Sequence, residues 1–342
     1  MTDSFFYLLI ASIVIALAFD MINGFHDAAN SIATVVSTRV LSPLVAVLWA
    51  AFFNFIAIFI FAPRVADTIA KIVKIEAHDS TFILVVCCGL LGAIIWNLLT
   101  WWWKLPTSSS HALIGGLSGA GLAYNGLEAL RLDVLALTAE FIVLAPLIGF
   151  VLGFILVIIA YWLCRKWTPT SVDAFFRKGQ LLSAALYSLG HGANDAQKTM
   201  GVIMALLLAA GFLQEDTPLS LTNDKTRWII LSCQLAMSIG TAFGGWRIVK
   251  TMGMKIIKLR PIGGFCAETA GAITLFLATQ AGIPVSTTHT ITGSIIGIGT
   301  AISPPSRIKW GIAARIIWAW IFTVPAAAAI SAACFYLIRF IF

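Results

Sequence analysis

Residues 190–198 read GHGANDAQK, and the rest of the chain is organised around this stretch. It places Asp195 and Lys198 between two apolar runs, LLSAALYSL before it and TMGVIMALLLAAGF after it. An ionisable group inside a membrane must face protein, water or a bound ion, so such a cluster is a candidate functional site. The alternative is that the two side chains form a structural ion pair.

A second copy of the cluster lies near the amino terminus. Residues 22–31 read INGFHDAANS, and their Gly24 and Asp27 correspond to Gly192 and Asp195 in a shared Gly-x-x-Asp core. Because chance is a poor explanation for two such clusters in one hydrophobic chain, we expect an internal repeat.

A second pair of motifs repeats in the same order. Residues 105–116 read LPTSSSHALIGG and residues 283–294 read IPVSTTHTITGS. In both, a proline is followed by three consecutive hydroxyl residues directly before a histidine, and an apolar segment with glycines comes next. Each half of the chain therefore carries one motif of each kind.

The composition is that of a membrane protein. The chain has 342 residues, of which 60% are apolar and 11% are charged, whereas soluble domains have about 25% charged residues. The net charge of +7 comes mostly from short loops, where basic residues set membrane orientation and do not indicate nucleic-acid binding. The six cysteines lie in apolar runs without metal-ligand spacing, so we expect neither disulfides nor a metal site.

A membrane crossing needs about 20 apolar residues, so we expect an all-α polytopic membrane protein with ten to twelve membrane segments. The first half is residues 1–163, a cytoplasmic linker is residues 164–179, and the second half is residues 180–342. The expected segments are residues 4–38, 43–62, 81–103, 106–125, 134–163, 180–213, 228–246, 263–281, 285–302 and 309–341. Segments 4–38 and 180–213 exceed one crossing and contain the polar clusters with their glycines, so we expect broken helices there.

The basic loops predict how the halves are oriented. With the linker and the loop at residues 247–260 in the cytoplasm, most loop lysines and arginines lie on that side, as the positive-inside rule requires. An odd number of crossings in each half then gives the halves opposite orientations. We therefore expect two inverted-topology repeats with broken or re-entrant helices, an architecture that secondary transporters use to build a site at the membrane midplane.

Proline followed by serine or threonine is typical of helix starts, since proline suits the first turn and hydroxyls cap free backbone amides. A helix that starts within the membrane aims N–H groups and a partial positive charge at whatever precedes it, which favours an anion. Two such starts, converging across the repeat axis, would bind a small tetrahedral oxyanion. The alternative is that the hydroxyls only cap or join helices. The hydroxyl residues concerned are Ser108, Ser109, Ser110, Ser286, Thr287 and Thr288.

Asp27 and Asp195 would repel that anion. Two carboxylates and a phosphate dianion carry about four negative charges, which a low-dielectric site tolerates only when they are paired or neutralised. Lys198 offsets one of them. Sodium ions, protons or a divalent metal bound to the phosphate must therefore enter with the substrate, and this charge balance predicts symport.

The paired elements GFHDAAN and GHGANDAQK, together with PTSSSH and PVSTTH, resemble the inorganic phosphate transporter (PiT) family over nearly the whole chain. The resemblance implies electrogenic symport of inorganic phosphate with Na+ or H+, an inverted-repeat fold and a homodimer. By position, Asp27 and Asn30 match the first motif of the family, and Gly192, Asn194 and Asp195 match the second.

The chain departs from the family pattern in both motifs. His26 stands where the family usually has Asn, and Gln197 with Lys198 replaces the usual Ala-Asn. The Gln-Lys form resembles bacterial low-affinity phosphate permeases, which implies a bacterial inner membrane, proton coupling and uptake of metal-phosphate. A fixed ammonium at Lys198 would occupy a place that sodium otherwise takes, so H+ is favoured and Na+ is the alternative.

These arguments assign roles to individual residues. We expect Asn194 and Lys198 to bind phosphate together with the six hydroxyl residues. The residues expected to hold a coupling cation are Asp27, Asp195, Asn23, Asn30 and Glu268. Glu268 lies in an apolar segment, and the matching first-half position is Leu90. His111 and His289 are candidates for a proton relay, although a neutral histidine bonded to the backbone fits equally well.

Two other functions fit less well. An intramembrane Ser/His/Asp enzyme needs one asymmetric constellation of nucleophile and base, whereas this chain has two near-equivalent copies. An anion channel would have a basic pore and would need no paired carboxylates. We therefore expect no enzyme activity and no cofactor. The expected partners are inorganic phosphate, the coupling cation, the lipid bilayer and a second copy of the chain, without nucleic acid.

Overall fold

The fold is built from helices. The computed structural model describes residues 3–74, 80–214, 216–252 and 257–341. Within these ranges it contains helices and turns, and no strand apart from one isolated bridge between Val73 and Leu130. The expectation of an all-α protein is confirmed.

Most helices begin and end within a few residues of the predicted segments. The first half contains α1 (Asp3–Ser37), α2 (Pro43–Ile56), α3 (Arg64–Ala70), α4 (Ser80–Trp102), α5 (Ser109–Asn125) and α6 (Leu132–Leu163). The second half contains α7 (Pro169–Ala209), α8 (Arg227–Phe243), α9 (Trp246–Lys250), α10 (Pro261–Gln280), α11 (Thr287–Ile302) and α12 (Trp310–Ile341). Proline stands in the first turn of α2, α7 and α10. A backbone N–H at this position would have no acceptor within the helix, so its absence from proline costs no hydrogen bond. Because α7 begins at Pro169, residues 169–179 of the expected linker are helical.

The helices α1 and α7 are each continuous, so the prediction of broken helices at residues 4–38 and 180–213 is wrong. The glycines of the motifs serve close packing instead. A Cβ atom at Gly24 would lie 2.1 Å from the carbonyl oxygen of Met237 in α8, and one at Gly192 would lie 2.5 Å from that of Asn54 in α2. Only glycine permits so close an approach of two helices.

The sharp bend lies in another part of the first half. The chain turns by 87° between α2, with its 3-10 extension Ala57–Phe59, and α3. Pro63 precedes α3, and a proline disfavours the helical conformation of the residue before it. The helix predicted at residues 43–62 therefore ends at Phe59, before Pro63.

Among the described residues, five helices are long and apolar enough to cross a membrane, or six if the bent pair forms one span. The five are α1, α4, α6, α10 and α12. The helices α5, α8 and α11 have 17, 17 and 16 residues, fewer than the about 20 of a full crossing. The protein is an integral membrane protein, while the number of ten to twelve segments stays a prediction.

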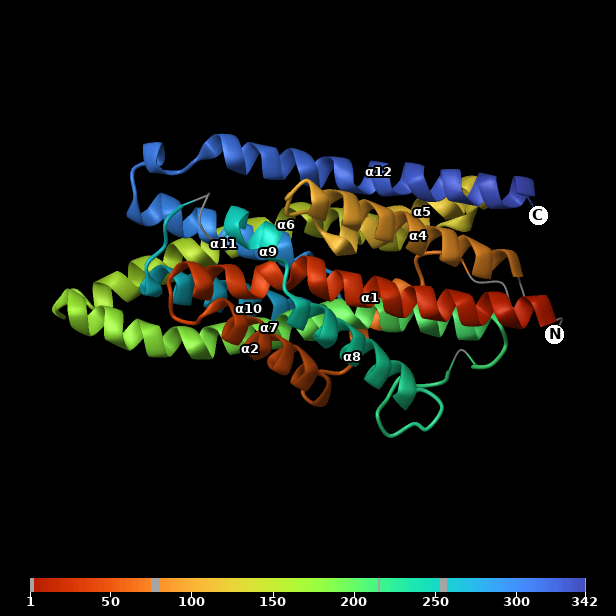
Figure 1. The fold of residues 1–342 in the computed structure, drawn as a ribbon, viewed down its shortest axis with the longest axis horizontal. Coiled ribbons are helices and arrows are strands. Elements are labelled where there is room, and N and C mark those ends of the chain that lie inside the picture. Colours follow the sequence, from red (N-terminus) through yellow and green to blue (C-terminus); the bar gives the residue numbers. More distant parts are fainter. Residues whose placement is uncertain (1–2, 75–79, 215, 253–256, 342) are drawn as a thin grey trace.

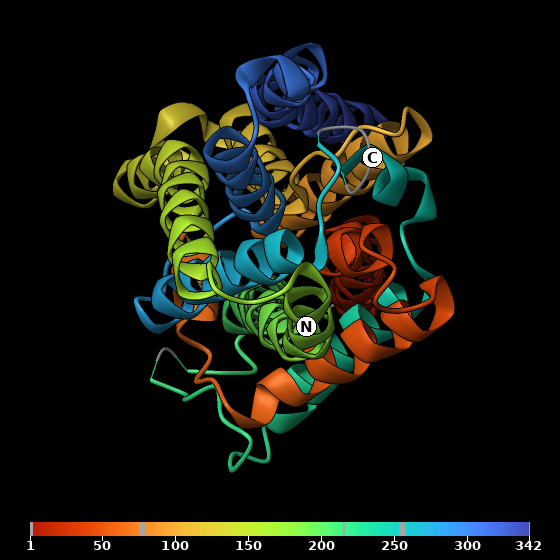
Figure 2. The same ribbon diagram turned by 90° about the vertical axis from the view of Figure 1, so that its left-hand side faces the viewer.

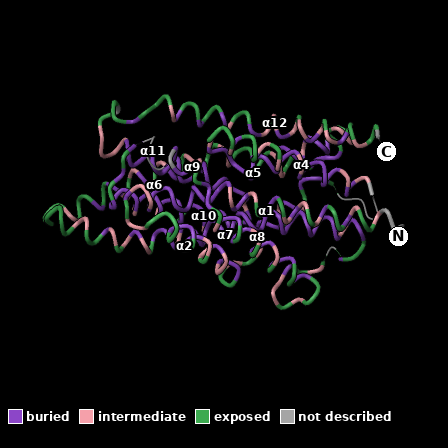
Figure 3. Tube along the Cα trace, in the orientation of Figure 1, coloured by how far each residue is buried: buried purple, intermediate pink, exposed green. Residues whose placement is uncertain are grey.

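The polar motifs lie at the centre of the helix assembly. In Figure 1, α1 and α7 lie near one another and run in opposite directions. The end view in Figure 2 places α12 at the edge, away from α1 and α7. Burial follows this arrangement, because most of residues 23–35 of α1, most of residues 183–209 of α7 and most of α10 are buried, whereas much of α12 is exposed (Figure 3). The apolar outer helices therefore separate the polar centre from the surroundings.

Each half packs its hydroxyl-bearing helix against the terminal helix of the other half. The helix α5 lies on α12, where a Cβ atom at Gly115 would be 2.5 Å from the carbonyl oxygen of Val324. The helix α11 lies on α6, where a Cβ atom at Gly293 would be 2.1 Å from that of Pro146. Gly115 and Gly293 occupy equivalent places in the two motifs. The same contact is thus made twice with the halves exchanged, and the halves interlock around one centre.

Candidate substrate and cation site

The helix starts of α5 and α11 meet at the centre. Ser108 Oγ accepts a hydrogen bond from the backbone N–H of His111 at 3.3 Å, and Ser286 Oγ accepts one from that of His289 at 3.2 Å. These two serines therefore cap their helices. The imidazole rings of His111 and His289 lie with centroids 4.4 Å apart, edge to face, so the two helix starts converge.

Hydrogen bonds cross between the two motifs. Ser110 Oγ donates to the carbonyl oxygen of Val285 at 3.3 Å, and Thr288 Oγ1 donates to that of Thr107 at 3.0 Å. All four residues are buried. Each motif thus satisfies backbone groups of the other, which holds the helix starts in one arrangement.

Asp195 and Lys198 form an ion pair at this centre. The distance from Lys198 Nζ to Asp195 Oδ1 is 2.5 Å, and both side chains are fully buried. The ammonium also donates to Ser110 Oγ, and to the carbonyl oxygen of Val285 at 2.8 Å. Lys198 of α7 therefore binds directly to the helix starts of α5 and α11.

The second carboxylate, Asp27, lies next to this pair. Ligand atoms of Asp27, His191 and Asp195 all lie within 4.8 Å of one another, which is about twice an oxygen–cation distance of about 2.3–2.6 Å. His191 Nε2 lies 3.3 Å from Asp195 Oδ2, and His26 Nδ1 lies 2.8 Å from Asp27 Oδ1. The structure thus brings both predicted acids to one place that suits a small cation.

Asn30 connects the two halves of the site. Its amide donates to Thr287 Oγ1 at 3.2 Å and to Thr288 Oγ1 at 2.8 Å. Thr287 Oγ1 in turn donates to Asp195 Oδ2 at 3.2 Å, and Tyr187 donates to the carbonyl oxygen of Thr287 at 3.0 Å. A change at Thr287 therefore acts on α1 and α7 together.

Three polar side chains at the helix starts have free hydrogen-bonding atoms. Ser109 Oγ, His111 Nδ1 and both ring nitrogens of His289 are buried, and none has a hydrogen-bond partner among the described residues. Ser109 is the first residue of α5. Its hydroxyl is therefore available to a ligand at the end of the helix, where the dipole favours an anion.

Two predicted site residues, Asn23 and Asn194, contact protein groups beside the centre. Asn23 Nδ2 lies 3.8 Å from the sulfur of Met237 in α8. Asn194 donates to the carbonyl oxygen of Ile283 at 3.2 Å and accepts from the N–H of Val285 at 3.3 Å. Asn194 thus positions the segment that precedes α11.

Glu268 lies in a separate polar cluster between α1, α7 and α10. Its carboxylate accepts hydrogen bonds from Thr34 at 2.6 Å, Gln180 at 2.9 Å and Ser183 at 2.5 Å. Three donors satisfy a buried carboxylate without a bound cation. No hydrogen bond or ion pair among the described residues joins Glu268 to Asp27 or Asp195.

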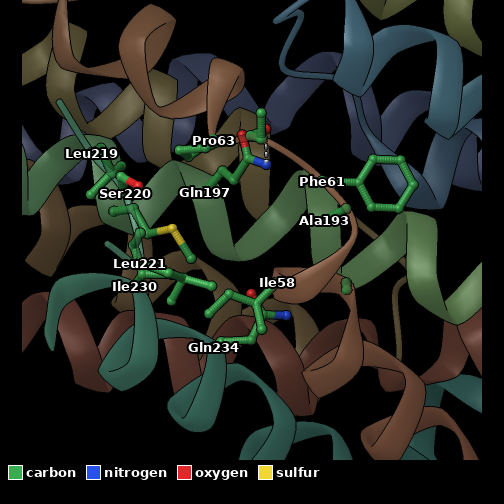
Figure 4. A pocket seen from close by; sticks show the side chains of 13 residues that line it. Ile58, Phe61, Pro63, Ala193, Gln197, Leu219, Ser220, Leu221, Ile230 and Gln234 are labelled. Carbon is green, nitrogen blue, oxygen red and sulfur yellow. Dashed lines mark hydrogen bonds between the residues drawn. The ribbon is translucent and has the colours of Figure 1, made fainter. Parts of the chain in front are cut away.

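Gln197 and Lys198 have different surroundings, although they are adjacent in the sequence. Gln197 Nε2 donates to the carbonyl oxygen of Ala62 at 3.1 Å, and its Oε1 accepts from the N–H of Val65 at 2.8 Å. It lines a cavity of about 320 Å³ together with Ala193 and Phe61 (Figure 4). Gln197 therefore ties α7 to the bend between α2 and α3, while Lys198 points into the polar centre.

Sequence reasoning did not assign a role to His191 or Tyr187. His191 stands four residues before Asp195, which places both on one face of α7, and this spacing was the available signal. Tyr187 lies four residues further back on the same face. Its hydrogen bond to α11 depends on how two distant helices pack, and the sequence holds no local sign of that packing.

Comparisons with known proteins agree with this geometry. The sequence matches the Phosphate transporter family over residues 23–331. It is 55% identical over 331 residues to a probable low-affinity inorganic phosphate transporter of Rhizobium meliloti (strain 1021), covering 97% of this chain and 96% of that protein. It is 41% identical over 340 residues to a protein of the same description from Bacillus subtilis (strain 168), covering 99% and 100%.

A solved structure described as the sodium-dependent phosphate transporter has the same fold. Its TM-score with this chain is 0.85 at 24% sequence identity, and the match covers 98% of this chain and 100% of that one. The family match extends over both copies of the two motifs that meet at the buried centre. The chain therefore belongs to the phosphate transporter family.

Proposed function

We propose that this member of the phosphate transporter family is a symporter that carries inorganic phosphate together with protons. The observation that carries the proposal is the meeting of two carboxylates, one ammonium and two helix starts at one buried centre. Its known relatives are transporters, which points away from an intramembrane enzyme.

Phosphate would bind at the converging ends of α5 and α11. The free Ser109 hydroxyl, the Ser110 and Thr287 hydroxyls and the Lys198 ammonium supply donors there. Charge-assisted hydrogen bonds to phosphate oxygens are shorter and stronger than neutral ones. The two helix dipoles add a favourable potential for the anion.

The charges at the centre require a positive companion for phosphate. Asp27 and Asp195 carry two negative charges and Lys198 carries one positive charge, so a phosphate dianion would bring the sum to about three negative charges in a dry site. Protons on phosphate, on the carboxylates or on His191 reduce this excess. Lys198 already occupies the place beside Asp195 where a sodium ion would bind, which favours H+.

Sodium coupling is the second candidate, and a specific observation supports it. The ligand atoms of Asp27, His191 and Asp195 leave a spacing that suits a small ion. A divalent metal that enters with phosphate would use the same oxygens and would neutralise the dianion directly. These alternatives differ in which added ion drives uptake.

The architecture proposed for transport is an inverted repeat. The opposite directions of α1 and α7 in Figure 1 support it, and so does the exchange of equivalent contacts at Gly115 and Gly293. A site between two such repeats can open alternately to each side of a membrane. We further propose a homodimer in a bacterial inner membrane, as the family resemblance implies.

The test is uptake of labelled phosphate by proteoliposomes under an imposed pH gradient, with and without sodium and with and without magnesium. Proton symport predicts accumulation that follows the pH gradient and does not need sodium. Accumulation that requires a sodium gradient and ignores pH would refute proton coupling. Counterflow of labelled phosphate without any gradient distinguishes a carrier from an enzyme.

A further inference from the structure

Asp20 is a buried acid to which the transport site gives no role. It lies within α1, and its side chain is fully buried. Neither carboxylate oxygen has a hydrogen-bond partner among the described residues. It stands seven positions before Asp27, which is two helical turns or about 10 Å along the same face of α1.

Among the described residues, no free cation lies beside Asp20. The groups close enough to influence its charge are Thr199, Asp195 and Lys198 of α7 and the Cys233 thiol of α8. The Lys198 ammonium is already bound to Asp195 and to Ser110 of the phosphate site. Asp20 therefore has a neighbouring charge network but no ion-pair partner of its own.

An ionised carboxylate in such a place is strongly unfavourable, because burial removes its hydration and no ion pair or hydrogen bond compensates for that loss. Glu268 shows the contrast, since three side chains donate hydrogen bonds to its carboxylate. Against these three donors, Asp20 has only the Thr199 hydroxyl nearby, and no described group lies within hydrogen-bond distance of its carboxylate. The simplest way for Asp20 to be neutral is to carry a proton.

We propose that Asp20 is a proton-binding site of the transport cycle, outside the phosphate site and coupled to it through Lys198 and Asp195. The inference rests on the proposed proton symport and names one of the groups that holds the proton. Water supplies the proton, an O–H bond forms on the carboxylate, and the proton returns to water on the side of release. Phosphate at the centre adds negative charge, which favours the protonated acid, and by linkage the proton favours bound phosphate.

The test compares Asp20→Asn with Asp20→Glu and with Ser12→Ala in proteoliposomes. Asparagine imitates the protonated acid and cannot release a proton, whereas glutamate can. Ser12 is a matched control because it is also fully buried in α1 and its hydroxyl has no hydrogen-bond partner within the described part of the chain. A gradient of one pH unit supports about a tenfold phosphate gradient for each proton carried, so loss of coupling is readily measured.

We expect Asp20→Asn to lose pH-driven accumulation while retaining counterflow of labelled phosphate. Asp20→Glu should recover accumulation in large part, and Ser12→Ala should behave as the parent. Infrared spectra of the purified parent should contain the carbonyl band of a protonated carboxylic acid, and Asp20→Asn should lack it.

Accumulation by Asp20→Asn with the pH dependence of the parent would overturn the inference. So would an unchanged carbonyl band, or a band that disappears when sodium is added, which would make Asp20 a sodium ligand. Loss of counterflow together with accumulation in a folded variant would show a binding or structural role. Failure of the proposed function is distinct, because the parent itself would then show no pH-driven uptake.

Discussion

Replacing Lys198 by methionine removes the ammonium from the centre and keeps an unbranched side chain. In the structure, Lys198 Nζ lies 2.5 Å from Asp195 Oδ1, and both side chains are fully buried. Breaking a buried pair by removing one partner costs about 3–5 kcal/mol, because the other charge is left unpaired. We therefore expect Lys198→Met to lose about that much free energy of unfolding in buffer without sodium.

Sodium should recover much of this loss. Without the ammonium, Asp195 has Asp27 and His191 as neighbours, with ligand atoms within 4.8 Å. A cation from solvent can then take the place of the lost charge. An ion that binds only the folded protein adds about 2.7 kcal/mol when present at 100 times its dissociation constant, which is comparable with the loss.

The measurements are thermal unfolding in detergent and phosphate uptake in proteoliposomes, each in sodium chloride and in choline chloride. The parent should melt at the same temperature in both salts and take up phosphate without sodium. Lys198→Met should melt higher in sodium and should take up phosphate only when sodium is present. Lys166→Met, at an exposed position in the connection between α6 and α7, is the control and should change neither result.

A variant Lys198→Met that melts and transports equally in both salts would refute the reasoning. It would mean that the ammonium does not stand in for a coupling cation. A parent that already requires sodium would refute it as well, since Lys198 would then leave room for the ion.

Three further predictions follow from the site and the packing. Asp27→Asn and Asp195→Asn should each abolish gradient-driven uptake, because the cation loses a ligand or the proton its carrier; normal accumulation in proteoliposomes by either variant would contradict the charge-balance argument. Ser109→Ala should weaken phosphate binding about tenfold or more, since a hydrogen bond to a charged group contributes about 1.5–3 kcal/mol. Its melting temperature should not change, because Ser109 Oγ has no hydrogen-bond partner in the ranges that the structure describes. Calorimetric titration with phosphate measures the first effect, and an equal loss of stability would instead indicate a structural hydroxyl. Gly24→Ala should lower stability by about 1–3 kcal/mol, because the new Cβ would lie 2.1 Å from a backbone oxygen of α8. Gly311→Ala, with open space around it, is the matched control, and equal melting temperatures of the two variants would contradict the packing argument.

Much of the candidate site could be predicted from the sequence because its two motifs each occur twice in the chain. The duplicated acids and the proline–hydroxyl helix starts are local patterns, and each keeps its meaning wherever the segment lies in the fold. Ser108 and Ser286 cap their helices as such patterns require. We expected the two copies to converge because a repeat would relate them by symmetry, and the rings of His111 and His289 are in contact.

Other features depend on contacts between distant segments. Glu268 has the same apolar neighbours in sequence as a coupling acid would have, yet three donors from α1 and α7 surround it. Asp20 is the opposite case, an acid in an apolar run whose carboxylate has no donor within hydrogen-bond distance among the described residues. The sequence around each acid predicts neither the three donors at Glu268 nor their lack at Asp20, because the donors of a buried carboxylate come from other helices.

By itself the sequence determined that the protein is an all-helical membrane protein, where most of its long helices lie and which acids and hydroxyls mark its centre. Only the tertiary structure decided whether the glycines of the two motifs break α1 and α7 or let neighbouring helices approach. In the sequence, a glycine that breaks a helix looks the same as one that lets a neighbouring helix pack closely. The choice depends on whether another backbone comes close enough to exclude a Cβ atom, as Met237 does at Gly24, and that is a property of packing between segments more than 200 residues apart.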